Sequence, residues 1–390
     1  MDSDVLQKKH THDLLKPDWL QIRSWLDNYH RLTHQEDNSE LPGYKSYRLL
    51  AETWVFQCWG SKSWDTLSSI LLTFLPNLER LKISRTYKST VIGIRGIIST
   101  ACLLQINRKI TPFALSNLSE VYLGRYQQGA AVIPPYCKND LMPFLRLPSI
   151  KTIVVDGIDD DEATNSMSFA SQVQELTLRH CQLFPFQINL MFTHCVALKR
   201  LHVDQRTFKA DVDISHIEFV LACYFRPLSH LSATLQTLEI IDDEKSIRGE
   251  EDAIPSHLIS GFSKLHTIDT TADLFLGRWL PPKEGSTSTT DRSDSRFKIT
   301  NFNKALVHLT LRHTDAYISQ YLVFSDPVQF QSQLPNLKTV HVQFRKGFKL
   351  DKVAWWHSLA SDYRKLGIVL SYNFCYEGDL APPPLTESNE

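Results

Sequence analysis

The chain has 390 residues, of which 42% are hydrophobic and 22% are charged. This composition excludes collagen-like, low-complexity and wholly disordered chains, and a chain of this length can bury a large core without disulfides or metals. The 42 lysines and arginines balance 43 aspartates and glutamates, so there is no overall basic charge to bind nucleic acid or an anionic membrane. We therefore expect a soluble globular or repeat protein with no nucleic-acid or membrane partner.

The cysteines and the apolar runs indicate an intracellular protein. Seven cysteines are widely spaced and form no C-x-x-C pair, unlike a disulfide framework or a zinc ribbon. The N-terminus has no apolar segment typical of a secretory signal, and the longest apolar runs, 70–75 and 91–98, are far shorter than a membrane span. These features predict a cytoplasmic or nuclear location.

The first 64 residues are expected to precede the main domain. Residues 1–16 are polar and are predicted to be disordered. A helical pattern opens at Pro17 and ends near Thr33, and a second pattern runs from Tyr44 to Trp59. Residues 17–64 are therefore interpreted as a helical N-terminal cap for the repeats that follow.

A pattern with apolar residues at positions i, i+3 and i+5 recurs nine times along the rest of the chain. Residues 75–83 (LPNLERLKI) and 334–342 (LPNLKTVHV) are the clearest pair of copies. The first apolar positions of the nine copies are Leu78, Leu118, Ile150, Val173, Leu198, Leu235, Leu265, Leu306 and Leu337. Since i+3 and i+5 lie on one side of a short strand, each copy predicts a strand that must stack on its neighbours to cover that side.

The segments between the strands are predicted to be helices. Their ranges are 65–75, 93–107, 138–147, 186–195, 213–225 and 326–334. L-x-x-L-x-L is the strand signature of leucine-rich repeats, so residues 65–376 predict an irregular leucine-rich-repeat array. The expected fold class is α/β: a solenoid, or horseshoe, with a parallel concave sheet and convex helices. An ordinary doubly wound α/β domain is the alternative.

Residues 281–297 are expected to form a flexible insertion, and residues 377–390 are expected to form a disordered tail.

The residues at i+2, i+4 and i+6 are predicted to face outward on the concave sheet and to bind a protein partner. They are nearly all polar, and Tyr and Arg are the residue types that most often anchor protein interfaces. Arg179 and Arg200 are also interpreted as a pair able to hold a carboxylate or a phosphate. The candidate partner-binding residues are Arg80, Lys82, Tyr122, Arg179, Arg200, His202, Asp204, Glu239, Arg312 and His341.

The repeat region resembles the leucine-rich-repeat portion of fungal F-box proteins. The resemblance rests on the Leu-Pro-Asn-Leu openings at 75 and 334, the long irregular repeats, the aromatic lead-in around 47–64 and the closing segments 355–360 and 367–370. It covers roughly residues 44–376. It implies a substrate receptor of a cullin–RING ubiquitin ligase, in which an F-box docks the adaptor subunit of the ligase and the repeats hold the target.

The F-box itself is not found. Its nearest match, Leu41-Pro42-Gly43, lacks the acidic residue and the apolar spacing that follow in an F-box. Two interpretations stay open: the box is missing from this gene product, or the protein binds partners without delivering them for ubiquitylation.

Signatures of catalysis and cofactor binding are absent from the sequence, so we expect neither an enzyme nor a cofactor. Asp211 and Asp213 form an Asp-x-Asp pair, which supports an alternative function as a metal-dependent transferase. The adjacent pairs His180-Cys181 and His194-Cys195 contain good zinc ligands but are interpreted as structural.

Overall fold

The computed structural model describes about two fifths of the chain. The described residues are 68, 72, 75, 77–85, 94–95, 98–99, 101–102, 115–125, 136–159, 169–181, 191–204, 228–241, 259–272, 302–314, 327–344 and 353–374. The predictions for the disordered N-terminus 1–16, the cap 17–64, the insertion 281–297 and the tail 377–390 lie outside these residues. The predicted helix 213–225 and the Asp211–Asp213 pair lie outside them too.

The chain divides into two compact units. The first contains residues 1–78 and 89–116, and the second contains residues 79–88 and 117–390. In the first unit, the described residues between 93 and 107 are helical, with Ile98, Ala101 and Cys102 buried. This agrees with the helix predicted for that range.

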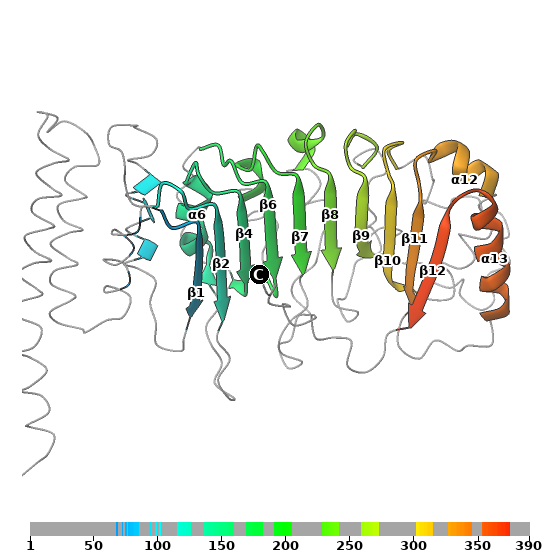
Figure 1. The fold of residues 1–390 in the computed structure, drawn as a ribbon, viewed down its shortest axis with the longest axis horizontal. Coiled ribbons are helices and arrows are strands. Elements are labelled where there is room, and N and C mark those ends of the chain that lie inside the picture. The colour runs from blue at the N-terminus through cyan, green and yellow to red at the C-terminus, as the bar shows by residue number, and fades with distance from the viewer. Residues whose placement is uncertain are drawn as a thin grey trace, which may run out of the picture. The chain divides into compact units, whose positions relative to one another are not determined.

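The second unit contains a ten-stranded, wholly parallel sheet (Figure 1). Its strands follow one another in chain order: β1 (Arg80–Arg85), β2 (Glu120–Arg125), β4 (Thr152–Asp156), β6 (Glu175–Arg179), β7 (Arg200–Asp204), β8 (Thr237–Ile241), β9 (Thr267–Thr271), β10 (His308–Thr314), β11 (Thr339–Phe344) and β12 (Val369–Phe374). The nine sequence copies form the first nine strands, so the predicted parallel sheet is confirmed. The tenth strand, β12, was not predicted.

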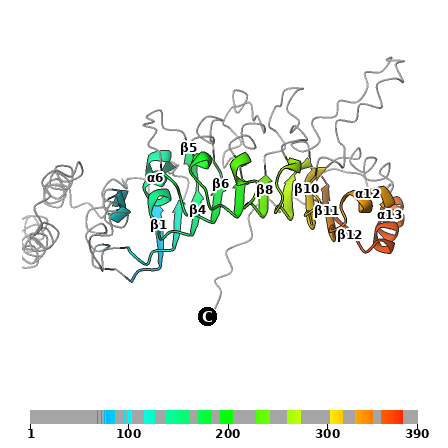
Figure 2. The same cartoon turned by 90° about the horizontal axis from the view of Figure 1, so that it is seen from above.

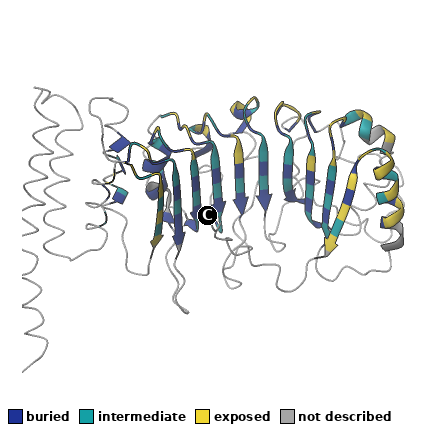
Figure 3. Ribbon diagram, viewed as in Figure 1, coloured by how far each residue is buried: buried dark blue, intermediate teal, exposed yellow. Residues whose placement is uncertain are grey.

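The apolar positions of the motif form continuous buried rows across the sheet. Strand pairing sets Leu176 opposite Leu201 and Leu178 opposite Val203, and the same register continues on both sides. Sixteen of the eighteen residues at positions i+3 and i+5 of the nine copies are buried: Val121, Leu123, Ile153, Val155, Leu176, Leu178, Leu201, Val203, Leu238, Ile240, Ile268, Thr270, Leu309, Leu311, Val340 and Val342. The other two, Leu81 and Ile83 on edge strand β1, are half-buried because β1 has only one strand neighbour in the sheet. Figure 3 shows the alternation along each strand.

A ladder of shared backbone carbonyls fixes this register where the strands begin. The carbonyl of Lys151 accepts hydrogen bonds from the backbone N–H groups of both Gln174 and Glu175, at 2.8 and 3.0 Å. Gln174 repeats the arrangement with Lys199 and Arg200. Among the described residues, eight carbonyls bind two N–H groups in this way: those of Glu79, Ser119, Lys151, Gln174, Lys199, Gln236, His266 and Val307. Each strand is therefore held at the same height as the one before it.

Tight turns bring each chain segment into its strand. The N–H groups of Ile150, Leu265 and Leu337 donate to carbonyls three residues earlier. In one repeat the buried amide of Asn303 strengthens this turn: its Nδ2 donates to the carbonyls of Phe262 and Leu265, while its Oδ1 accepts from the Ala305 N–H. A buried side chain with all these partners satisfied stabilises the contact between neighbouring repeats.

The described helices agree only in part with the predicted set. Helices α6 (Lys138–Arg146) and α12 (Pro327–Gln333) match predictions, and a short 3₁₀ turn, η2 (Ser229–Leu231), precedes β8. In Figure 2, α6 and the small strand pair β3 (Tyr136–Cys137) and β5 (Ile158–Asp159) lie on the same side of the sheet. Among the described residues, no helix is long and apolar enough to cross a membrane.

Helix α13 (Val353–Lys365) packs against the last strand, β12. Trp356, Tyr363 and Phe344 are almost completely buried there. The rings of Phe344 and Trp356 meet edge to face at 5.1 Å, and Tyr372 of β12 contacts both. The aromatic residues of this segment were noted in the sequence, but their pattern did not predict that they form a helix covering the end of the core.

Candidate functional site

The candidate site is the polar face of the sheet, defined as the residues at positions i+2, i+4 and i+6 of each strand. These residues alternate with the buried rows, as the partly exposed and buried positions of β4, β6 and β11 show. All ten candidate residues belong to this face: Arg80 and Lys82 on β1, Tyr122 on β2, Arg179 on β6, Arg200, His202 and Asp204 on β7, Glu239 on β8, Arg312 on β10 and His341 on β11. Because the strands pair in register, polar side chains of neighbouring strands meet in rows.

At the β1–β2 end, the face is basic and carries one aromatic ring. Arg80 Nε lies 3.0 Å from Glu120 Oε2, and the Lys82 ammonium lies 5.2 Å from the ring centre of Tyr122. The Tyr122 ring lies over Gly124, where an added Cβ would come within 2.5 Å of ring atom Cε1. Glycine at 124 therefore leaves the space that the tyrosine ring occupies.

Tyr122 also lies close to charges on the next two strands. Burial raises the pKa of the Tyr122 phenol above its usual value, the Asp156 carboxylate raises it further, and Arg179 lowers it. Asp156 in turn accepts a hydrogen bond of 2.7 Å from His180 Nδ1. His180 directly follows β6 and has a φ of 52°, in the left-handed region that histidine enters more readily than most residues. Tyr122, Asp156 and Arg179 therefore form one electrostatically coupled group.

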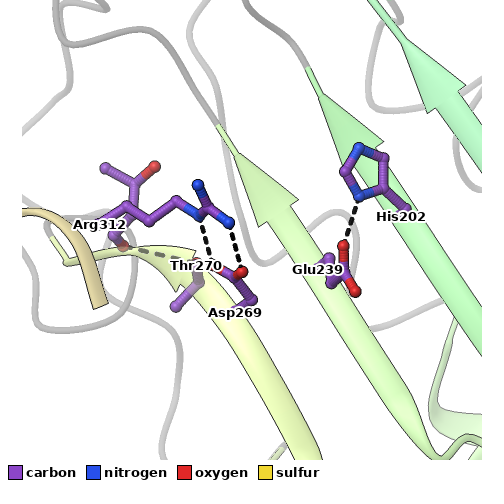
Figure 4. A network of polar contacts seen from close by, with 6 residues as sticks. His202, Glu239, Asp269, Thr270 and Arg312 are labelled. Atoms are coloured by element: carbon purple, nitrogen blue, oxygen red, sulfur yellow. Dashed lines mark hydrogen bonds and ion pairs between the residues drawn. The ribbon is translucent and has the colours of Figure 1, made fainter. Parts of the chain in front are cut away.

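In the middle of the face, His202 and Glu239 are paired across β7 and β8 (Figure 4). His202 Nδ1 donates to Glu239 Oε2 at 2.6 Å. This hydrogen bond lowers the pKa of the Glu239 carboxyl, burial opposes the shift, and the charges of His202, Arg312 and Arg200 add to the lowering. Glu239 is therefore ionised at neutral pH.

The next two strands carry a bidentate ion pair. Arg312 on β10 donates from Nε to Asp269 Oδ1 and from Nη2 to Asp269 Oδ2, both at 2.6 Å (Figure 4). The pair is largely buried, with 13% of the Asp269 side chain and 32% of the Arg312 side chain exposed. The hydrogen bond to Asp269 raises the pKa of Arg312, burial opposes this, and Asp269, Glu239 and Asp204 add to the rise. Planar, two-point geometry makes this the strongest type of ion pair that the face contains.

Beyond β10 the face has polar residues without formal charge. His308 Nδ1 lies 2.8 Å from Thr339 Oγ1, and His341 Nδ1 lies 2.8 Å from Ser371 Oγ on β12. Both are contacts between neighbouring strands. Cross-strand polar contacts thus continue to the last strand, which the sequence analysis did not include in the face.

Two sequence interpretations need correction. Arg179 lies opposite Asp204 and Arg200 lies opposite Glu175, so the two arginines sit at opposite ends of neighbouring strands rather than side by side. Arg200 Nη1 is moreover 3.3 Å from Glu175 Oε1. The interpretation of Arg179 and Arg200 as a joint anion site is therefore wrong. The alternating pattern of buried and polar residues shows which face of the sheet a residue lies on, but not which residue of the next strand lies opposite it.

Position i+6 is buried on three of the middle strands. Asp204 was predicted to face solvent, but only 3% of its surface is exposed, and Ile241 and Thr271 are buried too. Each is the last residue of its strand. The exposed part of the polar face in the middle strands therefore consists mainly of positions i+2 and i+4.

Within the part of the chain that the structure describes, the side chains form no site for a metal ion or a reactive thiol. No group of three or more His, Cys, Asp or Glu side chains there is placed to hold a metal ion. Cys181 is buried and its Sγ donates to the Arg179 carbonyl at 3.3 Å. Burial raises the pKa of the Cys195 thiol to about 12, so that thiol stays protonated.

Four acidic residues on the predicted face form pairs that the sequence did not predict. Glu120, Glu175 and Asp269 each pair with a candidate arginine, and Asp156 pairs with His180. All four stand at alternating positions of predicted strands, so the signal for their location was present. Their pairing required the register between strands, which the sequence pattern does not contain.

No model of a known protein family matches this sequence, and comparison with curated proteins gives no significant match.

Proposed function

We propose that this protein is a non-catalytic binding protein of the leucine-rich-repeat type, whose polar sheet face holds a protein partner. The observation that carries the proposal is the in-register parallel sheet, with buried apolar rows on one side and cross-strand polar rows on the other. Repeat proteins commonly use such an extended surface for partners. On this proposal the sheet is the inner layer of a repeat horseshoe.

The size of the face supports a protein partner. Ten strands at the usual spacing of about 4.8 Å extend about 43 Å, and positions i+2 to i+6 cover about 13 Å along each strand. With side chains added, this approaches the ~800 Å² per partner that stable protein complexes usually bury. Exposed arginines and a tyrosine supply the residue types that dominate binding energy at interfaces.

We further propose, from the resemblance to F-box proteins, that the chain is a substrate-recognition subunit of a cullin–RING ubiquitin ligase or a relative without an F-box. It would act in the cytoplasm or the nucleus. On this proposal the target lies on the polar face, and the ligase adaptor and cullin bind elsewhere.

The test is affinity capture from an extract of the source cells, followed by identification of the bound proteins. Capture of a target together with adaptor and cullin supports the ligase, and a target without them supports the relative lacking an F-box. Tyr122→Ala, Arg179→Ala and Arg200→Ala should each weaken capture, while Arg364→Ala on the exposed side of α13 should not. The proposal fails if the three face variants capture the partner as well as wild type does and the α13 variant does not capture it.

A further inference from the structure

Three exposed lysines lie where strands β9, β10 and β11 begin, and together they are called the lysine cluster: Lys264, Lys304 and Lys338. Lys264 and Lys304 lie in the turns before β9 and β10, and Lys338 directly precedes β11. Because all strands of the sheet run in the same direction, these positions share one rim of the sheet, at the amino-terminal ends of the strands (Figure 1). The rim adjoins the first residues of these strands on the polar face.

Asparagine side chains hold the three repeats of the lysine cluster against one another. The Nδ2 of Asn303 donates to two backbone carbonyls of the turn that contains Lys264. In the next repeat, Asn336 Nδ2 donates to the backbone carbonyl of Lys304 at 2.9 Å. The lysine backbones are therefore fixed on adjacent repeats, whose strands lie about 4.8 Å apart. Three like charges are thus held near one another by contacts that do not involve their ammonium groups.

The described residues around the lysine cluster do not neutralise its charge. Between residues 259 and 374, the described part of the chain holds two carboxylates, Asp269 and Asp362. Asp269 is paired with Arg312, and Asp362 is paired with Lys365. No lysine of the cluster forms an ion pair within the described structure. Unpaired like charges that are held close together favour an anionic partner.

Building on the proposed function, we infer that the partner docks an acidic segment, rich in aspartate or glutamate, on the lysine cluster at the amino-terminal rim of β9–β11. Alternate side chains of an extended segment lie about 6.6 Å apart, and neighbouring repeats lie about 4.8 Å apart. Carboxylates at every second position can therefore reach the long, flexible lysine side chains of successive repeats. Opposite charges steer association and suppress wrong partners, so this contact contributes to partner choice.

An acidic protein segment fits the lysine cluster better than single-stranded nucleic acid does. Proteins that bind single strands without sequence preference stack the bases on aromatic side chains. Phe262 and Phe302, the phenylalanines described in the segments before β9 and β10, are buried. The cluster therefore offers positive charge without a surface for base stacking.

The probes are labelled twelve-residue peptides that alternate serine with glutamate, glutamine or lysine, and a six-nucleotide thymidine oligomer of similar charge to the glutamate peptide. Binding to the full-length protein is followed by fluorescence anisotropy at low and high salt. We expect the glutamate peptide to bind at least about fivefold more tightly than the glutamine peptide, and to lose this advantage at high salt because exposed charges are screened. The lysine peptide and the oligomer should bind no more tightly than the glutamate peptide.

Replacing the three lysines locates the binding. The triple variant Lys264→Gln, Lys304→Gln and Lys338→Gln should reduce the preference for the glutamate peptide to about twofold or less, because each exposed charge contributes only a small part. Lys151→Gln removes an exposed lysine from the same rim at β4, four strands and about 19 Å from β9, and should change nothing. The reversed triple variant, Lys264→Glu with Lys304→Glu and Lys338→Glu, should prefer the lysine peptide, a reversal that loss of folding cannot produce.

Three results would overturn the inference: equal binding of the glutamate and glutamine peptides to wild type, an unchanged preference in the glutamine triple variant, or tighter binding of the thymidine oligomer than of the glutamate peptide, which would indicate nucleic acid. None of these outcomes removes the proposed function, which fails separately if variants on the polar face leave protein capture intact.

Discussion

Glu239 on β8 and Asp269 on β9 stand directly opposite each other in the middle of the polar face. Each carboxylate has a hydrogen-bond partner on its outer side, His202 for Glu239 and Arg312 for Asp269. The two carboxylates therefore lie between His202 on β7 and Arg312 on β10, and Arg312 reaches Asp269 from two residues beyond the position opposite it. The two outer groups make the central like-charge contact tolerable, which gives the predictions on Arg312 and Glu239 their direction.

Arg312→Ala should destabilise the protein by about 2 kcal/mol, between the ~0–1 of exposed ion pairs and the ~3–5 of fully buried ones. The loss arises because Asp269 is left partly buried beside Glu239 without its cation. Arg312→Lys should restore only part of this, since an ammonium cannot make both hydrogen bonds. Urea unfolding measures both variants. If Arg312→Lys were as stable as wild type, the positive charge alone, and not the pair of hydrogen bonds, would account for the stabilisation.

The Glu239 carboxyl makes stability depend on pH. Its pKa is lower in the folded state than in the unfolded chain, so its stabilisation is fully present above the unfolded value of about 4.3 and is lost as pH falls through the folded value. Wild type should thus exceed Glu239→Gln in unfolding free energy at pH 7, by about 1 kcal/mol or less for a side chain that is 35% exposed. The difference should vanish well below pH 4. A difference in unfolding free energy between wild type and Glu239→Gln that persists or grows in acid would contradict the lowered pKa of Glu239 in the folded state.

Gly124 should tolerate no large side chain while Tyr122 is present. Gly124→Val should cost about 1–3 kcal/mol, because the new side chain and the tyrosine ring claim the same space. Tyr122→Ala combined with Gly124→Val should recover most of that loss. Thermal unfolding of the two single variants and the double variant gives the coupling energy. Additive effects would mean that the ring does not lie over Gly124.

Leu201→Asp should unfold the repeat array or split it, because Leu201 is completely buried in the middle of the sheet. An unpaired carboxylate there costs several kcal/mol, comparable to a large part of a domain's stability. Arg200→Ala, one residue away on the polar face, should cost no more than about 1 kcal/mol. Circular dichroism during heating compares the two. Equal melting temperatures would contradict the alternation.

The strands could be predicted from the sequence more fully than the contacts of the candidate site. Apolar spacing located nine strands because burial acts on each strand locally, and Leu176 and Leu178 mark β6 without knowledge of any other strand. The pairing of Arg312 with Asp269 depends on contacts between repeats 43 residues apart in the chain, and no local pattern contains them. Strand β12 was missed because its sequence, VLSYNF, lacks the leucine spacing and is stabilised by the aromatic contacts of α13.

Site-specific photo-crosslinking tests the central claim, that the polar face binds a protein, most directly. A photoreactive amino acid replaces Thr177, in the middle of the polar face on β6, and in a matched variant replaces Ser361, exposed on α13. After irradiation in cells, the account predicts a crosslinked partner from position 177 that is absent, or much weaker, from position 361. Crosslinking from 361 alone, with none from 177, would contradict it.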